Sequence, residues 1–217
     1  MKQPIHHPDA STLMSFAAGS LPEALSAVVA AHVEMCSTCG RELRTAERIG
    51  AALFEQLEPA ALTAQMSGEA ERIPRRERWQ DQAYAECAPG SLPRAIQRLV
   101  GCDLDDVQWK RLGLGVWHMP LPLSEGATGD LRLLKIAPGQ IMPEHGHGGC
   151  ELTLVLAGAY RDEIGLFAAG DVADLGDDIE HMPISCAERG CICLIASEEK
   201  ARFKGLFARM VQPFTGL

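Results

Sequence analysis

The sequence has 217 residues, of which 47% are hydrophobic, so the chain is long enough for one large or two small globular domains. Its formal net charge of −9 argues against the basic surface that direct nucleic-acid binding requires. No apolar run of about 18 residues is present, so no transmembrane helix is expected. The first residues lack a secretory pattern, and eight cysteines without one are typical of thiols or metal ligands in a reducing compartment. We therefore expect a cytoplasmic protein.

The N-terminal part of the chain is predicted to form a small bundle of three helices. Asp9 or Ser11 is suited to cap the first helix, Ser20 the second, and Ser37 or Thr38 the third. Each of these side chains can accept a hydrogen bond from an unpaired N–H group at a helix start. Apolar residues then recur every three or four positions, as helices with one buried face require.

A metal-ligand pattern lies between the second and third of these helices. His32 would end one helix, and Cys36 and Cys39 would begin the next, so an imidazole and two thiols meet at a tight corner. These ligands suit tetrahedral zinc, which usually takes a fourth, and His6 and His7 are available before the first helix. The alternatives are a redox-active CxxC pair or two small buried cysteines. The histidine four residues before the first cysteine favours zinc.

The middle of the chain carries helix and linker patterns but no chemistry. Residues 62–85 are rich in Glu, Arg, Gln and Ala, with apolar residues three or four positions apart, which predicts an amphipathic helix. Ala88–Pro93 has the composition of a linker, and a short helix is expected at Arg94–Val100. The expected division is a helical domain at 1–85, a linker at 86–104 and a second domain at 105–217.

The second half of the chain consists of short apolar runs separated by Gly, Pro and Asp, such as LRLLKIA, ELTLVLAG and CICLIA. Many short strands joined by turn residues predict an antiparallel barrel or jelly roll. The expected fold class is therefore two-domain α + β, in which a small helical zinc-binding bundle precedes a jelly-roll-like antiparallel β-barrel.

A second metal-ligand pattern lies in this half, where the sequence matches G-x5-H-x-H-x3-E-x6-G. His145 and His147 are two apart on a predicted strand and so face the same side, and Glu151 returns after a turn. His181 adds an imidazole from a second hairpin. Three histidines and a glutamate suit zinc, iron, manganese or nickel, and the residues alone do not choose among them.

Cys191 and Cys193 form a further candidate pair. They flank one residue of a predicted strand, so their thiols share a face of the sheet. A redox role would require accessible thiolates, and the alternative is two small buried cysteines.

The first pattern, in a helical N-terminal module, resembles the zinc-binding anti-sigma domain of bacterial regulators, and the second resembles the paired cupin motifs. Together with CICL near Cys191 and RMVQPF near the C-terminus, they resemble the ChrR family of anti-sigma factors over essentially the whole chain. The resemblance implies zinc-binding residues in the first site, with His7 preferred to His6, and metal ligands in the second: His7, His32, Cys36 and Cys39 (site 1), and His145, His147, Glu151 and His181 (site 2).

The resemblance also implies a function. In that family the N-terminal domain sequesters an extracytoplasmic-function (ECF) sigma factor, and the cupin domain is needed for the response to singlet oxygen or related oxidants. The expected protein is therefore a transcriptional regulator and not an enzyme. Its expected partner is a sigma factor, without direct contact to nucleic acid or membrane.

The alternative function is that of a cupin-type metal-dependent dioxygenase or isomerase with an N-terminal regulatory zinc domain. The ligand set of site 2 can hold iron with open positions for oxygen and substrate. Leu, Ile, Val and Ala dominate the nearby strands, and Arg132 and Arg161 are the main candidates to orient a substrate. This apolar setting favours the regulator.

Overall fold

The computed structural model of the protein describes residues 3–60, 92–146, 149–177 and 179–199, and the backbone of 202–203. The helix predicted at 62–85 and the ligand candidate His147 lie outside the described residues. The helices, in chain order, are α1 (Ala10–Ala17), α2 (Glu23–Met35), α3 (Ser37–Glu55), α5 (Arg94–Val100) and the 3₁₀ helix η1 (Leu104–Asp106). The three N-terminal helices and the short helix α5 are therefore confirmed.

The helix starts agree only partly with the predicted caps. Asp9 caps α1, where its carboxylate accepts a hydrogen bond from the backbone N–H of Ser11 at 2.8 Å. The predicted cap of α2 is wrong, because the helix begins after Pro22 and not after Ser20. The ring of Pro22 fixes a backbone angle that suits entry into a helix.

The predicted cap of α3 is wrong as well. Ser37 and Thr38 lie in the first turn, and Cys36 occupies the capping position in an extended conformation (φ −121°, ψ 103°). The residue therefore breaks the helical path between α2 and α3, and its side chain lies at the corner that the two helices form.

The strands, in chain order, are β1 (Lys110–Gly113), β2 (Val116–Pro120), β3 (Asp130–Ile136), β4 (His145–Gly146), β5 (Glu151–Arg161), β6 (Leu166–Ala168), β7 (Val172–Leu175), β8 (Glu180–His181), β9 (Ile184–Ser185), β10 (Cys191–Ser197) and β11 (Arg202–Phe203). Eight of them form one antiparallel sheet, ordered β1-β2-β3-β10-β5-β6, with β7 and β9 also paired to β5. The other three form a small sheet, ordered β11-β4-β8.

The jelly-roll-like, antiparallel character of this half is confirmed, whereas the closed barrel is not. Within the described residues the ladders form two separate sheets rather than one closed circuit. The reason lies in β4 and β8, which are only two residues long and pair with each other instead of extending the large sheet.

The central strand β5 has two distinct faces because successive side chains point to opposite sides. Leu152 and Leu154 lie in one buried cluster together with Leu194 of β10. Val155 of β5 and Cys193 of β10 belong to a second buried cluster on the opposite face. We call these the outer and the inner face of the sheet, respectively.

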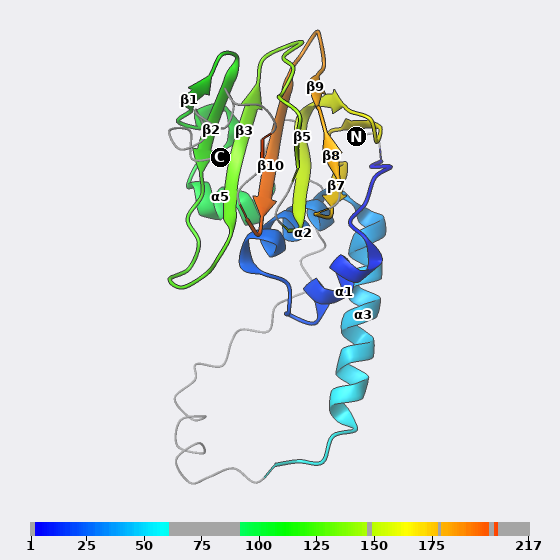
Figure 1. The fold of residues 1–217 in the computed structure, drawn as a ribbon. Coiled ribbons are helices and arrows are strands. Elements are labelled where there is room, and N and C mark those ends of the chain that lie inside the picture. Colours follow the sequence, from blue (N-terminus) through cyan, green and yellow to red (C-terminus); the bar gives the residue numbers. More distant parts are fainter. Residues whose placement is uncertain (1–2, 61–91, 147–148, 178, 200–201, 204–217) are drawn as a thin grey trace.

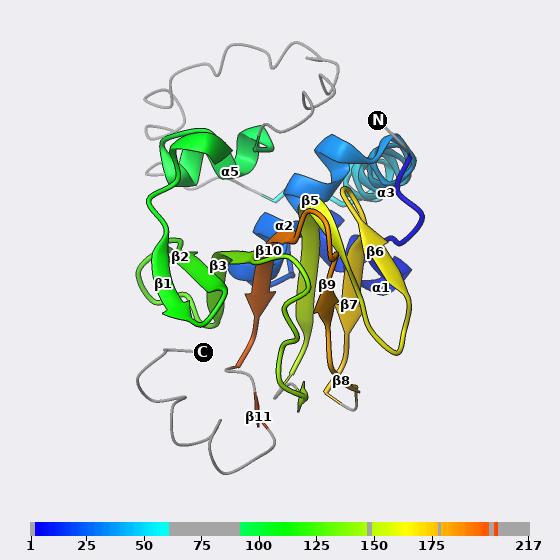
Figure 2. The same cartoon turned by 90° about the horizontal axis from the view of Figure 1, so that it is seen from above.

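Helix α2 packs on the outer face and joins the two halves of the molecule. Leu25, Val28 and Val29 are buried in the same cluster as Leu154 and Leu194. The helix contacts β3, β5 and β10, close to the C-terminal end of β10 (Figures 1 and 2). The helical and β parts therefore share one apolar core in the described structure.

Helix α3 extends away from the sheet (Figure 1). Its first turns are anchored by Leu43, which is buried, whereas the apolar residues of its second half are exposed. Within the described parts of the chain, no helix is both long and apolar enough to cross a bilayer.

Candidate metal centres

Site 1 is assembled at the corner between α2 and α3. His32 lies in the last turn of α2, Cys36 between the helices, and Cys39 in the first turn of α3. The segment before α1 supplies His7, whose Nδ1 lies 3.5 Å from Sγ of Cys36 and 3.3 Å from Sγ of Cys39. The four residues offer ligand atoms that all lie within 4.8 Å of one another. Their arrangement can hold a metal ion.

The environment of His32 fits a metal ligand. Its side chain is fully buried, and its Nδ1 donates a hydrogen bond to the carbonyl oxygen of Gly170 at 2.9 Å. A carbonyl only accepts, so Nδ1 carries the proton, and Nε2 keeps a free lone pair. Nε2 is buried and has no hydrogen-bond partner among the described residues. Burial lowers the pKa of His32 to about 4, so the imidazole stays neutral, as metal binding requires.

The environment of the two thiols of site 1 also suits a bound cation. Burial, followed by the neighbouring Cys36, raises the pKa of Cys39 to about 12 in the absence of metal. A metal ion would stabilise both thiolates and reverse this preference. Two cysteines and two histidines are the ligand types of closed, tetrahedral structural sites.

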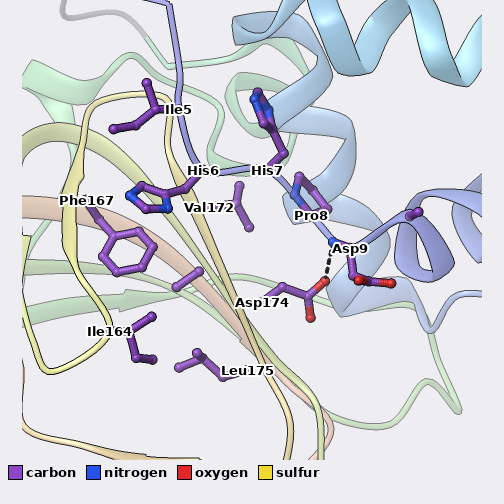
Figure 3. A pocket seen from close by; sticks show the side chains of 12 residues that line it. Ile5, His6, His7, Pro8, Asp9, Ile164, Phe167, Val172, Asp174 and Leu175 are labelled. Atoms are coloured by element: carbon purple, nitrogen blue, oxygen red, sulfur yellow. Dashed lines mark hydrogen bonds between the residues drawn. The ribbon is translucent and has the colours of Figure 1, made fainter.

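His6, the other N-terminal candidate, lies outside this cluster. Its ring packs on Phe167 with the centroids 4.4 Å apart. Figure 3 shows the His6 ring beside Phe167, whereas the ring of His7 points away toward the helices. The geometry therefore separates the two adjacent histidines, of which His7 is the member of site 1.

Site 2 lies where the small sheet meets the start of β5. His145 of β4 is directly opposite His181 of β8, and their Nε2 atoms are 3.2 Å apart. Glu151 begins β5, and its carboxylate lies with both imidazoles within 4.8 Å. All three side chains are at least nine-tenths buried. The described part of site 2 can therefore hold a metal ion as well.

Both histidines of site 2 are oriented by a partner on the far side of the ring. Nδ1 of His145 donates to the carbonyl oxygen of Pro143, and Nδ1 of His181 donates to Oδ2 of Asp162, each at 2.9 Å. These bonds turn both Nε2 atoms toward the site, as in metal centres whose histidines are held by a carbonyl or carboxylate.

Sequence reasoning missed the residues that orient these histidines. Asp162 was not a candidate. Burial raises the pKa of its carboxyl group, but hydrogen bonds from His181 and from two backbone N–H groups outweigh this effect, so the pKa lies below its usual value. Gly170 was not a candidate either. The available signals were turn residues: an Asp two positions after a tyrosine in the RDE stretch, and the Gly-Asp pair.

Cys191 and Cys193 are both buried on the inner face of the sheet, as their alternation predicted. A hydrogen bond with Cys191 and then burial raise the pKa of Cys193 well above its usual range. The Cys193 thiol is therefore protonated, and both side chains are shielded in the folded chain. Their redox role stays a prediction that would require prior opening of this face.

The comparisons with known proteins agree with this architecture. A family model described as the ChrR Cupin-like domain matches residues 97–201. The anti-sigma-E factor ChrR of Cereibacter sphaeroides is 40% identical over 215 residues, which cover 96% of this chain and 97% of that protein. The crystal structure of Rhodobacter sphaeroides SigE in complex with the anti-sigma ChrR matches with a TM-score of 0.74 and 37% identity, covering 88% of this chain and 98% of that one. The chain therefore belongs to the ChrR family of anti-sigma factors.

Proposed function

We propose that this protein sequesters an ECF sigma factor and thereby keeps it from RNA polymerase. Membership of a family of anti-sigma factors supports a regulatory rather than a catalytic role. The solved relative is a complex with a sigma factor, and the likeness to its anti-sigma chain extends over most of the present chain. Since sigma factors act on RNA polymerase, the proposed place of action is the cytoplasm.

The observation that carries the proposal is an exposed apolar stripe on the second half of α3. Four large apolar side chains in this part of the chain are between 55% and 75% exposed: Ile49, Leu53, Phe54 and Leu57. Ile49 and Leu53 are four residues apart in α3 and therefore lie on one side of the helix, and Leu57 follows directly after the C-cap Gln56. Exposed apolar surface of this kind marks interaction sites, and an amphipathic helix placed in a groove is a common docking mode.

The charge of the chain supports the same partner. The net charge is −9, and an acidic protein is complementary to the basic, polymerase-binding regions of a sigma factor. Charge of this sign speeds the encounter, whereas the apolar stripe supplies the buried contact.

We further propose that site 1 holds zinc, which fixes the direction of α3. The ion would tie the end of α2, the start of α3 and the N-terminal segment at one point, through Cys36, Cys39, His32 and His7. Because the stripe lies on α3, its orientation depends on this corner. Zinc supplies no redox chemistry here; its part is to hold the helices together.

For site 2 we propose zinc or another divalent metal held by His145, Glu151 and His181, with His147 as the fourth ligand. We also propose that the cupin half receives an oxidative, singlet-oxygen-type signal. The donor set and the buried, oriented imidazoles support the metal site. The proposed domain division stays at 1–85, 86–104 and 105–217, with α2 packed across it.

The test is binding of the chain to the ECF sigma factor of its own cell. Leu53→Asp places a charge in the middle of the stripe and should weaken binding by at least about 100-fold, as for a central interface residue. Leu114→Asp is the matched control, since Leu114 is 81% exposed in the turn between β1 and β2. Equal binding by both variants and the wild type would contradict docking through α3.

A further inference from the structure

The segment before α1 is bound to the cupin half by a buried carboxylate. Oδ1 of Asp171 accepts hydrogen bonds from the backbone N–H groups of Ile5 at 2.7 Å and His6 at 3.1 Å. Its other oxygen accepts from the backbone of Ala168 at 2.9 Å within the β6–β7 turn. Asp171 is 3% exposed, so these three donors replace the water it lost on burial.

Two more hydrogen bonds extend this contact along β7. The backbone N–H of Val172 donates to the carbonyl oxygen of His6 at 3.2 Å, and the N–H of Asp9 donates to Oδ2 of Asp174 at 2.9 Å. Figure 3 shows the segment beside Phe167 of β6 and Val172 and Asp174 of β7. The segment and these strands together line a pocket of about 500 Å³. Specific hydrogen bonds along β7 therefore position the segment.

Gly170, which precedes Asp171 in the same turn, contacts His32, the other histidine of site 1. The carbonyl oxygen of Gly170 accepts the hydrogen bond from Nδ1 of His32 at 2.9 Å. Gly170 has φ +96°, a conformation that side chains rarely adopt, and a Cβ there would lie 2.8 Å from Cγ of Pro4. The turn thus needs glycine both to aim its carbonyl and to admit the N-terminal segment.

Two adjacent residues of the cupin half therefore position two ligands of the N-terminal metal site. Gly170 holds His32 in the required tautomer, and Asp171 holds the backbone next to His7. The two cysteines take their positions from the α2–α3 corner. We propose that the Gly170–Asp171 turn is the outer shell of site 1, so that the cupin half completes the metal site of the helical half.

The same strand leads directly to site 2. Beyond the turn, β7 pairs with β5, where Leu175 is opposite Glu151, a ligand candidate of site 2. A change that moves β7 would thus change how tightly site 1 holds its metal. By linkage, metal at site 1 strengthens the docking of the N-terminal segment on β7 to the same extent.

The inference rests on the metal proposed for site 1, and the test uses the full chain with Co²⁺ as the probe. Thiolate-to-cobalt charge transfer reports site 1 alone among the two sites, because the ligand candidates of site 2 carry no sulfur. Asp171→Ala should weaken Co²⁺ binding in this band by about 10- to 100-fold, as removal of outer-shell partners does. Asp171→Asn keeps one acceptor oxygen and should lie between this variant and the wild type.

Asp103→Ala is the matched control. The carboxylate of Asp103 also accepts two backbone hydrogen bonds, from Leu92 and Leu104 at 2.7 Å each, but lies in the linker between the halves. The Asp103→Ala variant should bind Co²⁺ at site 1 with an affinity within about twofold of the wild type, a smaller change than outer-shell substitutions cause. Circular dichroism checks folding, and Gly170→Ala is the second variant if Asp171→Ala does not fold.

The outcomes separate the inference from the proposed function. Wild-type affinity in Asp171→Ala, or equal losses in Asp171→Ala and Asp103→Ala, overturns the outer-shell role while site 1 stands. If Asp171→Ala does not fold, wild-type affinity in both Asp171→Asn and Gly170→Ala overturns it too. A wild-type chain without the thiolate band overturns metal binding at site 1, and the outer-shell role with it.

Discussion

Three of the four described histidines at the metal sites share one arrangement at the scale of single atoms. His32, His145 and His181 each use Nδ1 to donate to a carbonyl or carboxylate oxygen at 2.9 Å. The opposite nitrogen is thereby left with its lone pair toward the neighbouring ligand candidates. At these three positions the hydrogen bond of Nδ1 thus orients the opposite nitrogen toward the site.

Replacing one thiol of site 1 should remove its metal. Cys39→Ser deletes a soft ligand, so Co²⁺ affinity measured by the thiolate charge-transfer band should fall by more than the roughly 10- to 100-fold loss seen for outer-shell changes. Cys102→Ser is the control, because Cys102 lies outside the cluster. Unchanged affinity in Cys39→Ser would exclude this residue as a ligand.

The metal-free chain should lose stability in acid because of His32. Burial depresses its pKa in the folded chain from 6.5 to about 4, so the unfolded chain takes up a proton first. The contribution of His32 is fully present above pH 6.5 and is lost as the pH falls toward 4. From pH 7.5 to 5 the free energy of unfolding should drop by about 2 kcal/mol more in the wild type than in His32→Gln. Equal drops in urea titrations would show that His32 does not titrate in this way.

At the scale of elements, the sequence predicted which helices exist better than it predicted where each helix begins. Helices at the N-terminus and at Arg94–Val100 follow from apolar periodicity, and the caps at Ser20, Ser37 and Thr38 failed because Pro22 and Cys36 take those positions. The residue types and spacings pointed to the ligand candidates that the described structure brings together, since ligand chemistry is local. Asp162, Gly170 and Asp171 could not be found in this way, because their partners are distant in sequence and meet only after folding.

Loss of apolar volume should lower stability more in α2 than on the exposed second half of α3. Leu25 is 1% exposed in the core shared with the sheet, whereas Leu53 of α3 is 60% exposed. Leu25→Ala should lower the free energy of unfolding by about 3 kcal/mol, and Leu53→Ala by less than about 0.5 kcal/mol. Chemical denaturation of the metal-loaded chain measures both. Similar losses in the two variants would contradict the packing of α2 on the sheet.

At the scale of the whole molecule, the two halves are in direct contact and are not joined by a linker alone. Helix α2 packs on the outer face of the sheet, and the segment with His7 lies on β7. Composition and motif order predicted a helical part and a cupin part, and membership of the ChrR family confirms that resemblance. Their shared core was not predicted, because the apolar periodicity of a helix shows that one face is buried but not which surface that face packs against.

In the proposed function, the chain withholds a sigma factor from RNA polymerase. The most direct measurement is a competition in which the metal-loaded chain is titrated into a mixture of the ECF sigma factor of its own cell and RNA polymerase core. We expect a one-to-one complex with sigma that holds about two metal ions per anti-sigma chain, one for each filled site, and loss of sigma from core. Sigma that stays on core at saturating concentrations of the chain would contradict it.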